Sequence, residues 1–372
     1  MRLLYAYNPS RMGGGSNNGT RATIELARRN GCETEVFTRD SKDLPAGWTR
    51  RLRAGASAIY PRQTVRDFAR TLDRFRPDVV HVYELFPLVS PWILPECSRR
   101  GIPVVMNCDD YRLTCPVMTH LRAGQLCTEC SDGREYRCIL RNCRQNLAES
   151  VTYASYSMTV RKLRLFAEHV TRFVVLSEFT RAWFIEHAGI SADRIAVVPP
   201  IIAVPDSAAD PAEGTYAAFA GRFVPEKGID ILLQAARLSG VPVRLCRDKS
   251  FFPTITLPAD VPVTIAHDRS QLDLFYRGAR MFILPSTWFE TFGIVGAESM
   301  AHGIPVIASR LGAMTSLVRH EIDGLLVEPG NVEVLANQMR RLWDDPALCR
   351  ELGTAAHLRA AQNWDAAAHW KQ

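Results

Sequence analysis

The amino-acid sequence predicts an α/β protein made of two doubly wound domains in series. Its 372 residues exceed the roughly 250–300 residues at which a single hydrophobic core usually stops growing. Short apolar runs alternate with stretches of helical periodicity along the chain, a pattern typical of βαβ units and parallel sheets. The pattern is interrupted once and then begins again, so we expect two sheets.

In the first half of the chain, four apolar runs predict strands and two stretches predict helices. One helix is expected at Thr20 to Arg29, where Asn30-Gly31 offers a C-cap, and another begins near Ser177. The strands are expected at Arg2 to Tyr7, Asp78 to Tyr83, Ile102 to Asn107 and Arg172 to Leu176. Parallel pairing of these strands would place helices on both faces of the sheet.

The interruption is the stretch from Pro199 to Gly214, which is rich in Pro, Ala and Asp and has no periodicity. A helical tail rich in Ala, Leu and Arg closes the chain from Val332 to Gln372. Between the two, strands are expected at Tyr216 to Ala220, Val241 to Leu245, Val261 to Ala266, Met281 to Leu284 and Ile304 to Ala308. The strand pattern therefore restarts after the interruption.

We expect three parts in order. A Rossmann-like N-terminal domain covers residues 1–200 and includes a Cys-rich insertion at 115–143. A Rossmann-like C-terminal domain covers 201–355, and residues 356–372 form a helix that returns to the N-terminal domain. Ligands of doubly wound sheets bind at the carboxyl ends of the strands, so the predicted site is a cleft between the two domains, which close over a bound ligand.

Composition and charge exclude several functional classes. With 47% hydrophobic residues the chain is neither disordered nor fibrous. A formal net charge of +6, from 45 Lys and Arg against 39 Asp and Glu, suits a phosphorylated small molecule or an anionic membrane better than a nucleic acid. No apolar run approaches the ~18–20 residues that span a bilayer, and the apolar amino terminus is too short for a signal peptide. We expect a cytoplasmic protein without a nucleic-acid partner.

A glycine-rich turn follows the first predicted strand. It contains Gly13, Gly14 and Gly15, and glycine lets a backbone approach a ligand closely at a helix N-terminus. The turn does not match a dinucleotide fingerprint, because Asn18 occupies the place of its last glycine, nor a P-loop, because Thr20 replaces the lysine. A plain flexible turn and a substrate-contacting turn both remain open.

Two segments of the second predicted domain carry charged residues between a strand and a helix. In GRFVPEKG, Arg222 and Lys227 flank a helix start and can bind phosphate oxygens. In PSTWFETFGIVGAESMAHGIPVI, which starts at residue 285, Glu290 follows a strand and Glu298 lies on the next helix. Carboxylates accept hydrogen bonds from sugar hydroxyls, while backbone amides at a helix start bind phosphate. For Glu298, a structural ion pair with a neighbouring arginine is the alternative.

These segments resemble the signature of the family 4 glycosyltransferases, which have the GT-B fold of two Rossmann-like domains facing across a cleft. The resemblance extends to the segments SEF (177–179), DGLLVEPG (323–330) and NCDDYRLTCP (107–116), in the family's order along most of the chain. It implies that Arg222 and Lys227 bind the donor diphosphate and that Glu298 binds the nucleotide ribose. Catalytic Glu290 would hold the donor sugar and phosphate together with Thr291, Phe292, Gly293 and Ile294, and glycines 13–15 would line the acceptor side.

One departure concerns the first domain. Family members usually have a histidine that faces the transferred sugar before the Asp-Tyr pair, whereas this chain has Asp109-Asp110-Tyr111. We expect Asp109 to take this catalytic position and to bind a sugar hydroxyl.

The resemblance implies a retaining transfer of a sugar from a UDP-sugar, or else a GDP-sugar, to a hydroxyl acceptor. A bacterial cell-surface polysaccharide, lipopolysaccharide or glycolipid pathway is the expected setting. No D-x-D triplet for a diphosphate-bound cation occurs in the sequence, so arginine, lysine and backbone amides are expected to stabilise the leaving group without a metal cofactor. The alternatives are a sugar-nucleotide epimerase of the same fold and a non-catalytic sugar-nucleotide-binding protein.

Five of the ten cysteines fall within 29 residues. They are Cys115, Cys127, Cys130, Cys138 and Cys143. A C-x-x-C pair with further cysteines nearby predicts a structural zinc site, with Cys115, Cys127, Cys130 and Cys143 as ligands and Cys138 as an alternative. Unpaired or redox-active thiols and disulfides are the other interpretations.

Two further segments predict contacts rather than chemistry. Residues 161–166 (RKLRLF) mix cations with apolar side chains in an expected helix, which indicates either a solvated helix face or peripheral contact with an anionic inner membrane that carries a lipid-linked acceptor. In the tail, Trp364, His369 and Trp370 are the expected anchors of the final helix on the first domain.

Overall fold

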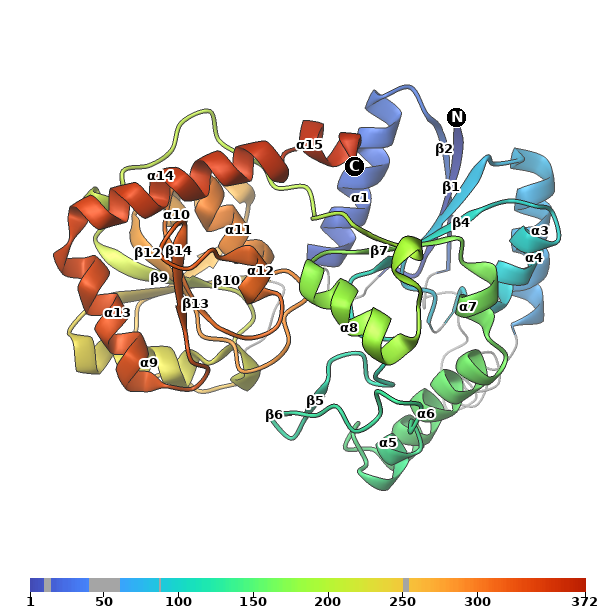
Figure 1. Ribbon diagram of the computed structural model, residues 1–372, viewed down its shortest axis with the longest axis horizontal. Helices are drawn as coiled ribbons and strands as arrows, with labels where there is room; N and C mark the ends of the chain where they lie inside the picture. Colours follow the sequence, from blue (N-terminus) through green and yellow to red (C-terminus); the bar gives the residue numbers. More distant parts are fainter. Residues whose placement is uncertain (10–14, 40–60, 87, 250–253) are drawn as a thin grey trace. The chain divides into compact units, whose positions relative to one another are not determined.

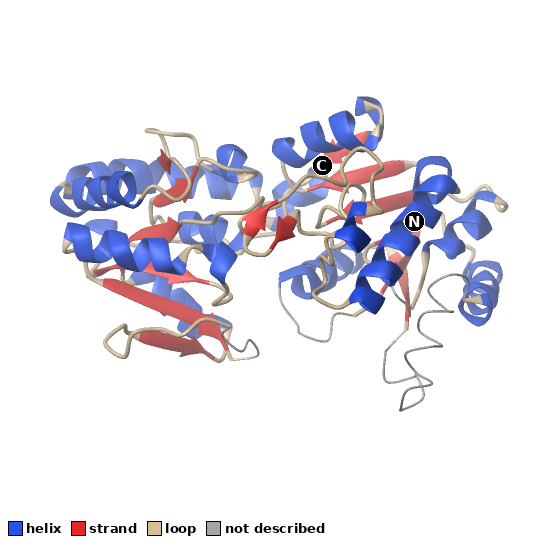
Figure 2. Cartoon of the chain, turned by 90° about the horizontal axis from the view of Figure 1, so that it is seen from below, coloured by secondary structure: helices blue, strands red, loops and turns tan. Residues whose placement is uncertain are grey.

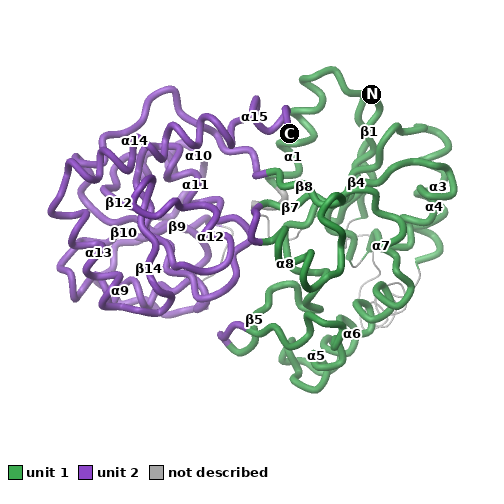
Figure 3. The backbone as a smooth tube through the Cα atoms, viewed as in Figure 1, with its two compact units in different colours: residues 1–123, 127–176, 180–198 green, residues 124–126, 177–179, 199–372 purple. Residues whose placement is uncertain are grey.

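The computed structural model describes residues 1–9, 15–39, 61–86, 88–249 and 254–372. Within these residues the chain forms two compact units, each with one six-stranded parallel sheet (Figure 1). Unit 1 contains residues 1–123, 127–176 and 180–198, and unit 2 contains residues 124–126, 177–179 and 199–372 (Figure 3). Helices flank the strands of both sheets (Figure 2). The predicted α/β class with two doubly wound sheets is confirmed.

The sheet of unit 1 has the order β2-β1-β3-β4-β7-β8, and its neighbouring strands pair in parallel. Its core strands are short apolar runs because a parallel sheet is covered on both faces. The strands are β1 (Arg2–Tyr7), β2 (Glu33–Thr38), β3 (Val79–Val82), β4 (Val104–Cys108), β7 (Arg172–Val175) and β8 (Ile195–Val197). The helices are α1 (Gly15–Arg29), α3 (Arg62–Phe75), α4 (Leu94–Ser98), α6 (Leu147–Lys162), α7 (Leu165–His169) and α8 (Glu178–Ala188).

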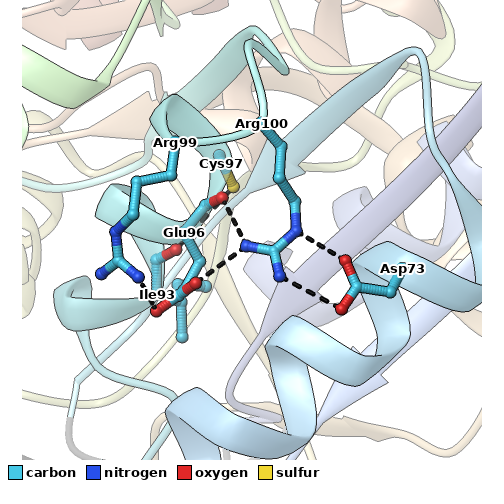
Figure 4. A network of polar contacts seen from close by, with 6 residues as sticks. All are labelled: Asp73, Ile93, Glu96, Cys97, Arg99 and Arg100. Atoms are coloured by element: carbon cyan, nitrogen blue, oxygen red, sulfur yellow. Dashed lines mark hydrogen bonds and ion pairs between the residues drawn. The ribbon is translucent and has the colours of Figure 1, made fainter.

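Helices α3 and α4 are joined by a charged network (Figure 4). The Arg100 guanidinium donates to both carboxylate oxygens of Asp73, at 2.8 and 3.2 Å, and to the Glu96 carboxylate at 2.8 Å. Arg99 donates to the other oxygen of Glu96 at 2.7 Å. This network fixes the helix pair without using any predicted site residue.

The insertion between β4 and β7 forms a small hairpin and three helices, α5, α6 and α7. The hairpin strands are β5 (Leu121–Arg122) and β6 (Gln125–Leu126), and α5 (Arg137–Leu140) packs beside α6. The predicted helix over 161–166 is wrong as one element. Helix α6 ends at Lys162, Arg164 adopts the left-handed φ of 52°, and α7 begins at Leu165. The reversed backbone at Arg164 breaks the helix.

The sheet of unit 2 has the order β11-β10-β9-β12-β13-β14, again with parallel pairing. Its strands are β9 (Tyr216–Ala220), β10 (Val243–Asp248), β11 (Val263–Ala266), β12 (Ala279–Leu284), β13 (Val306–Ser309) and β14 (Gly324–Val327). Its helices are α9 (Ile229–Ser239), α10 (Arg269–Arg277), α11 (Ile294–Ala301), α12 (Met314–Leu317), α13 (Val332–Asp344), α14 (Pro346–Asn363) and α15 (Ala366–Lys371). In the described residues, no helix has both the length and the apolar character needed to span a membrane.

The C-terminal tail is three helices rather than one. Asp345 and Asp365 interrupt it, because their side chains accept hydrogen bonds from the Leu348 and Ala368 amides at 2.9 and 2.6 Å and so begin new helices. The predicted boundary at 355/356 falls inside α14. The predicted contact of the last helix with the first domain stays a prediction.

The interdomain stretch is held to unit 2 rather than free. Ile202 is buried, and its amide donates to the Trp364 carbonyl at 2.7 Å. Asp210 accepts from the Ala212 amide at 2.9 Å and so caps a single turn of 3-10 helix that precedes β9. The chain therefore enters β9 from a defined direction.

Candidate active site

The predicted donor residues lie on two loops at one edge of the unit 2 sheet. Strands β9 and β12 are parallel neighbours, so the loops that follow them leave the sheet at the same end. The Thr287 amide donates to the Glu226 carbonyl at 3.0 Å, which joins the two loops. Gly228 makes this approach feasible, because a Cβ atom there would lie 2.0 Å from the Pro285 carbonyl oxygen. The glycine of the GRFVPEKG segment is therefore required by packing.

Lys227 and Glu290 form a buried ion pair between these loops. The Lys227 Nζ lies 2.6 Å from Glu290 Oε1, and the two side chains are only 15% and 9% exposed. Ser286 Oγ and Trp288 Nε1 donate to the same oxygen at 2.8 and 2.9 Å. Burial alone would raise the pKa of Glu290, but the Lys227 charge and these hydrogen bonds outweigh it and lower the pKa. Glu290 is thus a carboxylate, not a proton donor, near neutral pH.

The start of α11 presents free backbone donors. Gly293 is the N-cap in the left-handed conformation, with φ at 90°, and no side chain caps the helix. Among the described residues, no acceptor receives the amides of Gly293, Ile294 or Val295, although the Gly296 and Ala297 amides return to the Gly293 carbonyl. Unpaired amides at a helix N-terminus favour an anion.

Loop packing sets this conformation. A Cβ atom at Gly293 would lie 2.5 Å from Met314 Cε and 3.1 Å from Leu317 Cδ2 of α12. The buried Phe292 ring meets the Trp364 ring edge-on, with centroids 5.7 Å apart. The loop is therefore held on one side by α12 and on the other by the end of α14.

Glu298 lies one turn into α11 and has two partners from α10. Its Oε1 pairs with the Arg269 guanidinium, and its Oε2 accepts from the Tyr276 hydroxyl at 2.8 Å. The ion pair that we considered as the alternative for Glu298 is therefore present. The sequence analysis did not identify Arg269 and Tyr276. Their spacing of seven residues, which places both on one face of a helix, is the only signal in the sequence that they act together.

Arg222 follows β9 and is half-buried. Among the described residues, no carboxylate lies within ion-pair distance of its guanidinium. Within the part of the chain that the structure describes, no carboxylate compensates its charge. The structure pairs Lys227 with Glu290, the residue before the 291–294 loop, and it places Arg222 in the same loop as Lys227 without an ion pair or hydrogen bond to Glu290 or Glu298 among the described residues.

In unit 1, acidic residues follow two neighbouring strands, β3 and β4. Asp109 accepts a hydrogen bond from the Asn107 amide group. Asp110 is held by Arg112 through two hydrogen bonds of 2.8 and 2.6 Å. Glu84, which the sequence did not single out, follows β3, and burial raises its pKa more than the Arg112 charge lowers it. The predicted Asp109 thus lies at the carboxyl edge of its sheet.

The glycine turn is only partly described. Gly13 and Gly14 lie outside the described residues. Helix α1 begins at Gly15, five residues before the predicted Thr20, so Gly15 belongs to the first helical turn rather than to a loop.

The five clustered cysteines line one small cavity beside Pro116 and Arg122. All ten cysteines of the chain are free thiols. Burial raises the pKa values of Cys130 and Cys138 to about 12, so these thiols are protonated. In the part of the chain that the structure describes, no three His, Cys, Asp or Glu side chains are placed to hold a metal ion. The zinc site stays a prediction, although its cysteines share one cavity.

Two protein families match this chain, one mainly in each unit. Residues 14–200 match the glycosyl transferase 4-like domain, and residues 255–359 match the glycosyl transferases of group 1. The first match covers half of the chain.

Curated relatives include D-inositol 3-phosphate glycosyltransferases. The one from Pseudarthrobacter chlorophenolicus is 30% identical over 51% of this chain and 51% of its own length. The one from Acidothermus cellulolyticus is 36% identical over 48% and 46%. An exopolysaccharide phosphotransferase of Streptomyces coelicolor is 31% identical over 54% of this chain but 22% of its own. The chain thus spans about half the length of these relatives, or less.

Solved structures match the entire chain. HepE of Anabaena, in complex with UDP and glucose, has a TM-score of 0.66 at 18% identity and covers 100% of this chain and 98% of its own. Sucrose-phosphate synthase of Thermosynechococcus elongatus has a TM-score of 0.70 at 18% identity, with 100% and 96% covered. At this identity the likeness concerns the fold. Together with the family matches, it shows that the chain belongs to the GT4-type glycosyltransferases and has the GT-B fold.

Proposed function

We propose that the protein transfers a sugar from a nucleotide diphosphate sugar to a hydroxyl acceptor with retention of the anomeric configuration. The observation that carries this proposal is the anion site of unit 2. Lys227 is buried, Arg222 has no carboxylate partner among the described residues, and the α11 start presents free amides. A diphosphate supplies the negative charge that Arg222 and the free amides lack.

The donor nucleotide is proposed from Glu298 and from a relative. Glu298 is already bound by Arg269 and Tyr276, so its carboxylate is oriented to accept hydrogen bonds from ribose hydroxyls. UDP is favoured because the HepE structure contains UDP, and GDP is the second candidate. A matched set of UDP-, GDP- and ADP-sugars in a thermal-shift assay tests the choice, since ligand at 100 times its Kd adds about 2.7 kcal/mol to stability.

The proposed chemistry breaks the bond between C1 of the sugar and the diphosphate oxygen and forms a bond from C1 to the acceptor oxygen. In a front-face transfer the acceptor proton passes to the departing phosphate oxygen, so no protein nucleophile is needed. Glu290 is ionised and fixed by Lys227, Ser286 and Trp288. It therefore serves to hold the donor sugar. The role proposed for Asp109 is a hydrogen bond to a sugar hydroxyl.

The acceptor is proposed by class only. The curated relatives named D-inositol 3-phosphate glycosyltransferases act on a polyol, as their name states, and another relative is named for exopolysaccharide. These names support a hydroxyl acceptor in cell-surface polysaccharide or glycolipid synthesis. The ten free thiols support a reducing compartment and hence the cytoplasm.

We propose that transfer needs no metal, because Arg222, Lys227 and the α11 amides stabilise the leaving group. Activity that survives EDTA supports this proposal, and activity lost with EDTA and restored by a divalent cation contradicts it. A structural zinc ion at the cysteine cavity is a separate proposal, tested by metal analysis of the purified protein: about one zinc per chain supports it, and none contradicts it.

A sugar-nucleotide-binding protein without turnover, or an epimerase of the same fold, is the competing function, because Asp109 occupies the place of the family's histidine. Binding cannot separate these functions, but product analysis can. Sugar transferred to a hydroxyl, lost in Glu290→Gln, supports the transferase. Donor that binds and is recovered unchanged supports the binding protein, and donor recovered as its epimer supports the epimerase.

A further inference from the structure

Three arginines of the unit 1 insertion surround one carboxylate. Guanidinium nitrogens of Arg122, Arg137 and Arg141 lie 3.6, 3.6 and 3.3 Å from the carboxylate oxygens of Glu129. Their side chains are 36%, 34% and 53% exposed. One carboxylate neutralises one guanidinium, so this group, the Glu129 cluster, carries an excess of two positive charges at the surface.

The other arginines of the insertion do not add to this excess. Arg134 pairs with Asp132, Arg144 with Glu149 and Arg161 with Glu135. Each of these pairs is locally neutral. Among the arginines of the insertion, the uncompensated charge therefore lies at the Glu129 cluster, on and beside α5.

Exposed apolar side chains lie on the same helices. Of the sixteen large apolar side chains that are exposed in the described residues, six fall between residues 136 and 163. Leu140, at the end of α5, is 75% exposed, and Leu147, at the start of α6, is 60% exposed. Such a concentration marks an interaction surface rather than scattered surface residues.

Helix α6 exposes three large apolar side chains. Leu147, Val151 and Met158 follow one another at intervals of four and seven residues, which places them on one helix face, and all three are exposed. Ala154 lies on this same face but is buried against Cys130 and Cys138 of the insertion, whereas the buried Val160 lies on the opposite face. The three exposed side chains therefore border the contact between α6 and the insertion, and they stay exposed although a helix in water normally turns its apolar residues inward.

We propose that α5 and α6 form a docking surface for an anionic lipid bilayer. The arginines of the Glu129 cluster would bind lipid phosphate groups, for which a guanidinium is well shaped. Leu140, Leu147, Val151 and Met158 would enter the boundary between headgroups and acyl chains, as in helices that lie in the plane of a membrane. Helices α5 and α6 pack side by side (Figure 1), so both kinds of contact come from one part of unit 1.

The charge of the surface favours a bilayer over the other occupants. A symmetric pair of chains joined through this face would bring two Glu129 clusters, each with excess positive charge, toward one another. A nucleic acid would satisfy the arginines but would leave the exposed aliphatic side chains in water, because bases stack on aromatic rings rather than on leucine. An anionic bilayer satisfies both.

This surface replaces the membrane contact predicted at residues 161–166. Leu165 and Phe166 are 3% and 8% exposed, so they belong to the core and cannot enter a bilayer. The physical reason is the break at Arg164, which turns α7 inward. The membrane surface therefore moves to the preceding helices.

Vesicle co-sedimentation of the full chain tests the proposal. The assay contains neither donor nor acceptor, so its outcome is independent of sugar transfer. We expect binding to vesicles that contain phosphatidylglycerol, little binding to pure phosphatidylcholine, and weaker binding as salt increases. The Arg137→Gln/Arg141→Gln variant should bind about 30-fold more weakly. Its control is Arg62→Gln/Arg66→Gln, an exposed pair with the same spacing on α3, which should bind like wild type.

Two further variants separate the apolar and charged contributions. Leu140→Ser/Leu147→Ser should lose about tenfold or more in vesicle affinity, while Leu274→Ser/Leu358→Ser, which changes leucines that are 70% and 53% exposed in unit 2, should not. Glu129→Gln removes the neutralising charge and should bind anionic vesicles several-fold more tightly. This gain keeps the test decisive if an arginine variant folds poorly.

Four results would overturn the proposal. They are no vesicle binding, equal binding to neutral vesicles, loss in the α3 control variant, and a concentration-dependent dimer that the leucine variant abolishes. A last experiment adds inorganic phosphate in place of vesicles. Stabilisation of the protein by phosphate, without binding to vesicles, would show a site for a free anion and would also contradict the docking surface.

Discussion

Arg222 and Lys227 follow the same strand but have different surroundings. Lys227 is committed to Glu290 at 2.6 Å, whereas Arg222 has no carboxylate partner among the described residues. A cation without an internal partner contributes little to folding, and its charge is available to a ligand. We therefore expect substitutions of Lys227 and of Arg222 to differ in their effects on stability and on donor binding.

For Arg222→Gln we expect donor affinity to fall by at least tenfold, because a charged hydrogen bond to phosphate is worth about 1.5–3 kcal/mol. The free energy of unfolding should change by less than about 0.5 kcal/mol. Donor titration by calorimetry and a denaturant melt measure the two quantities. Arg237→Gln on the exposed face of α9 is the control and should change neither donor affinity nor stability. Equal donor affinity in the two variants would show that Arg222 does not bind the donor.

The pKa of Glu290 gives a pH dependence with a defined sign. A carboxyl group with a lowered pKa in the folded state stabilises the fold above its ordinary pKa and loses this contribution as the pH falls through the lowered value. Wild-type stability should therefore decline below the ordinary pKa of 4.5. The decline should be shallower in Glu290→Gln, measured by urea melts across acidic pH. Lys227→Met removes the main cause of the lowering and should also flatten the curve; an unchanged slope in both variants contradicts the ion pair.

Single residues of the site could be predicted from the sequence only where they belong to a recognisable motif. Glu290 and Lys227 stand in recognisable segments, and the structure joins them. Arg269 and Tyr276, which hold Glu298, come from α10, a helix whose sequence carries no motif. Their approach depends on how α10 packs on α11, and that packing cannot be obtained from the order of residues along the chain.

At the scale of elements, the turn from the β9 loop into α9 depends on Gly228. Gly228 and Gly240 both have a φ of 69°, but a Cβ atom at Gly228 would lie 2.0 Å from the Pro285 carbonyl oxygen, and one at Gly240 only approaches an arginine side chain at 4.0 Å. Backbone strain is thus the same at both positions, and the clash is specific to one.

Gly240→Ala should cost about 1–2 kcal/mol from its left-handed backbone alone. Gly228→Ala should cost clearly more and should also weaken donor binding, because Lys227 must shift with the loop. Thermal melts and donor titrations of both variants measure this difference. Equal destabilisation would show that the two loops separate easily.

The end of α14 supports the donor loop through Trp364. This side chain is 4% exposed and packs on Phe292, whereas Trp370 on α15 is 42% exposed. Trp364→Ala should cost about 3–5 kcal/mol and should reduce donor affinity, because Phe292 precedes the free amides of α11. Trp370→Ala is the matched control. If Trp364→Ala lowers the melting temperature but leaves donor affinity intact, the support of the loop is wrong.

The strands that sequence reasoning missed are all at sheet edges. Strands β2 and β8 end the unit 1 sheet, and β14 ends that of unit 2. β2 (ETEVFT) is mostly polar because it is partly exposed, and β8 has only three residues. The nine predicted strands lie mostly in the sheet interiors, where burial on both faces demands continuous apolar runs. The sequence therefore reveals the sheet centres more clearly than their borders.

For the whole molecule, the division into two α/β units follows from the repeated strand pattern, and the predicted interruption begins at Pro199, where the main segment of unit 2 also begins. The closure of two domains over a donor is a property of both units together and stays a prediction. So does the contact of the C-terminal helix with the first domain, since Trp364 and His369 have partners in unit 2: Phe292 and the Pro199 carbonyl, the latter 2.8 Å from His369 Nδ1.

The central claim is that the unit 2 anion site supports sugar transfer with retention. The most direct measurement needs no knowledge of the acceptor, because water replaces it in slow donor hydrolysis. NMR at early times, before the released sugar equilibrates, shows which anomer forms from a UDP-sugar or GDP-sugar. We predict release of the same anomer as in the donor by wild type and a rate lower by about 10²–10³-fold in Glu290→Gln. Release of the opposite anomer, or bound donor that no acceptor or water ever consumes, would contradict the claim.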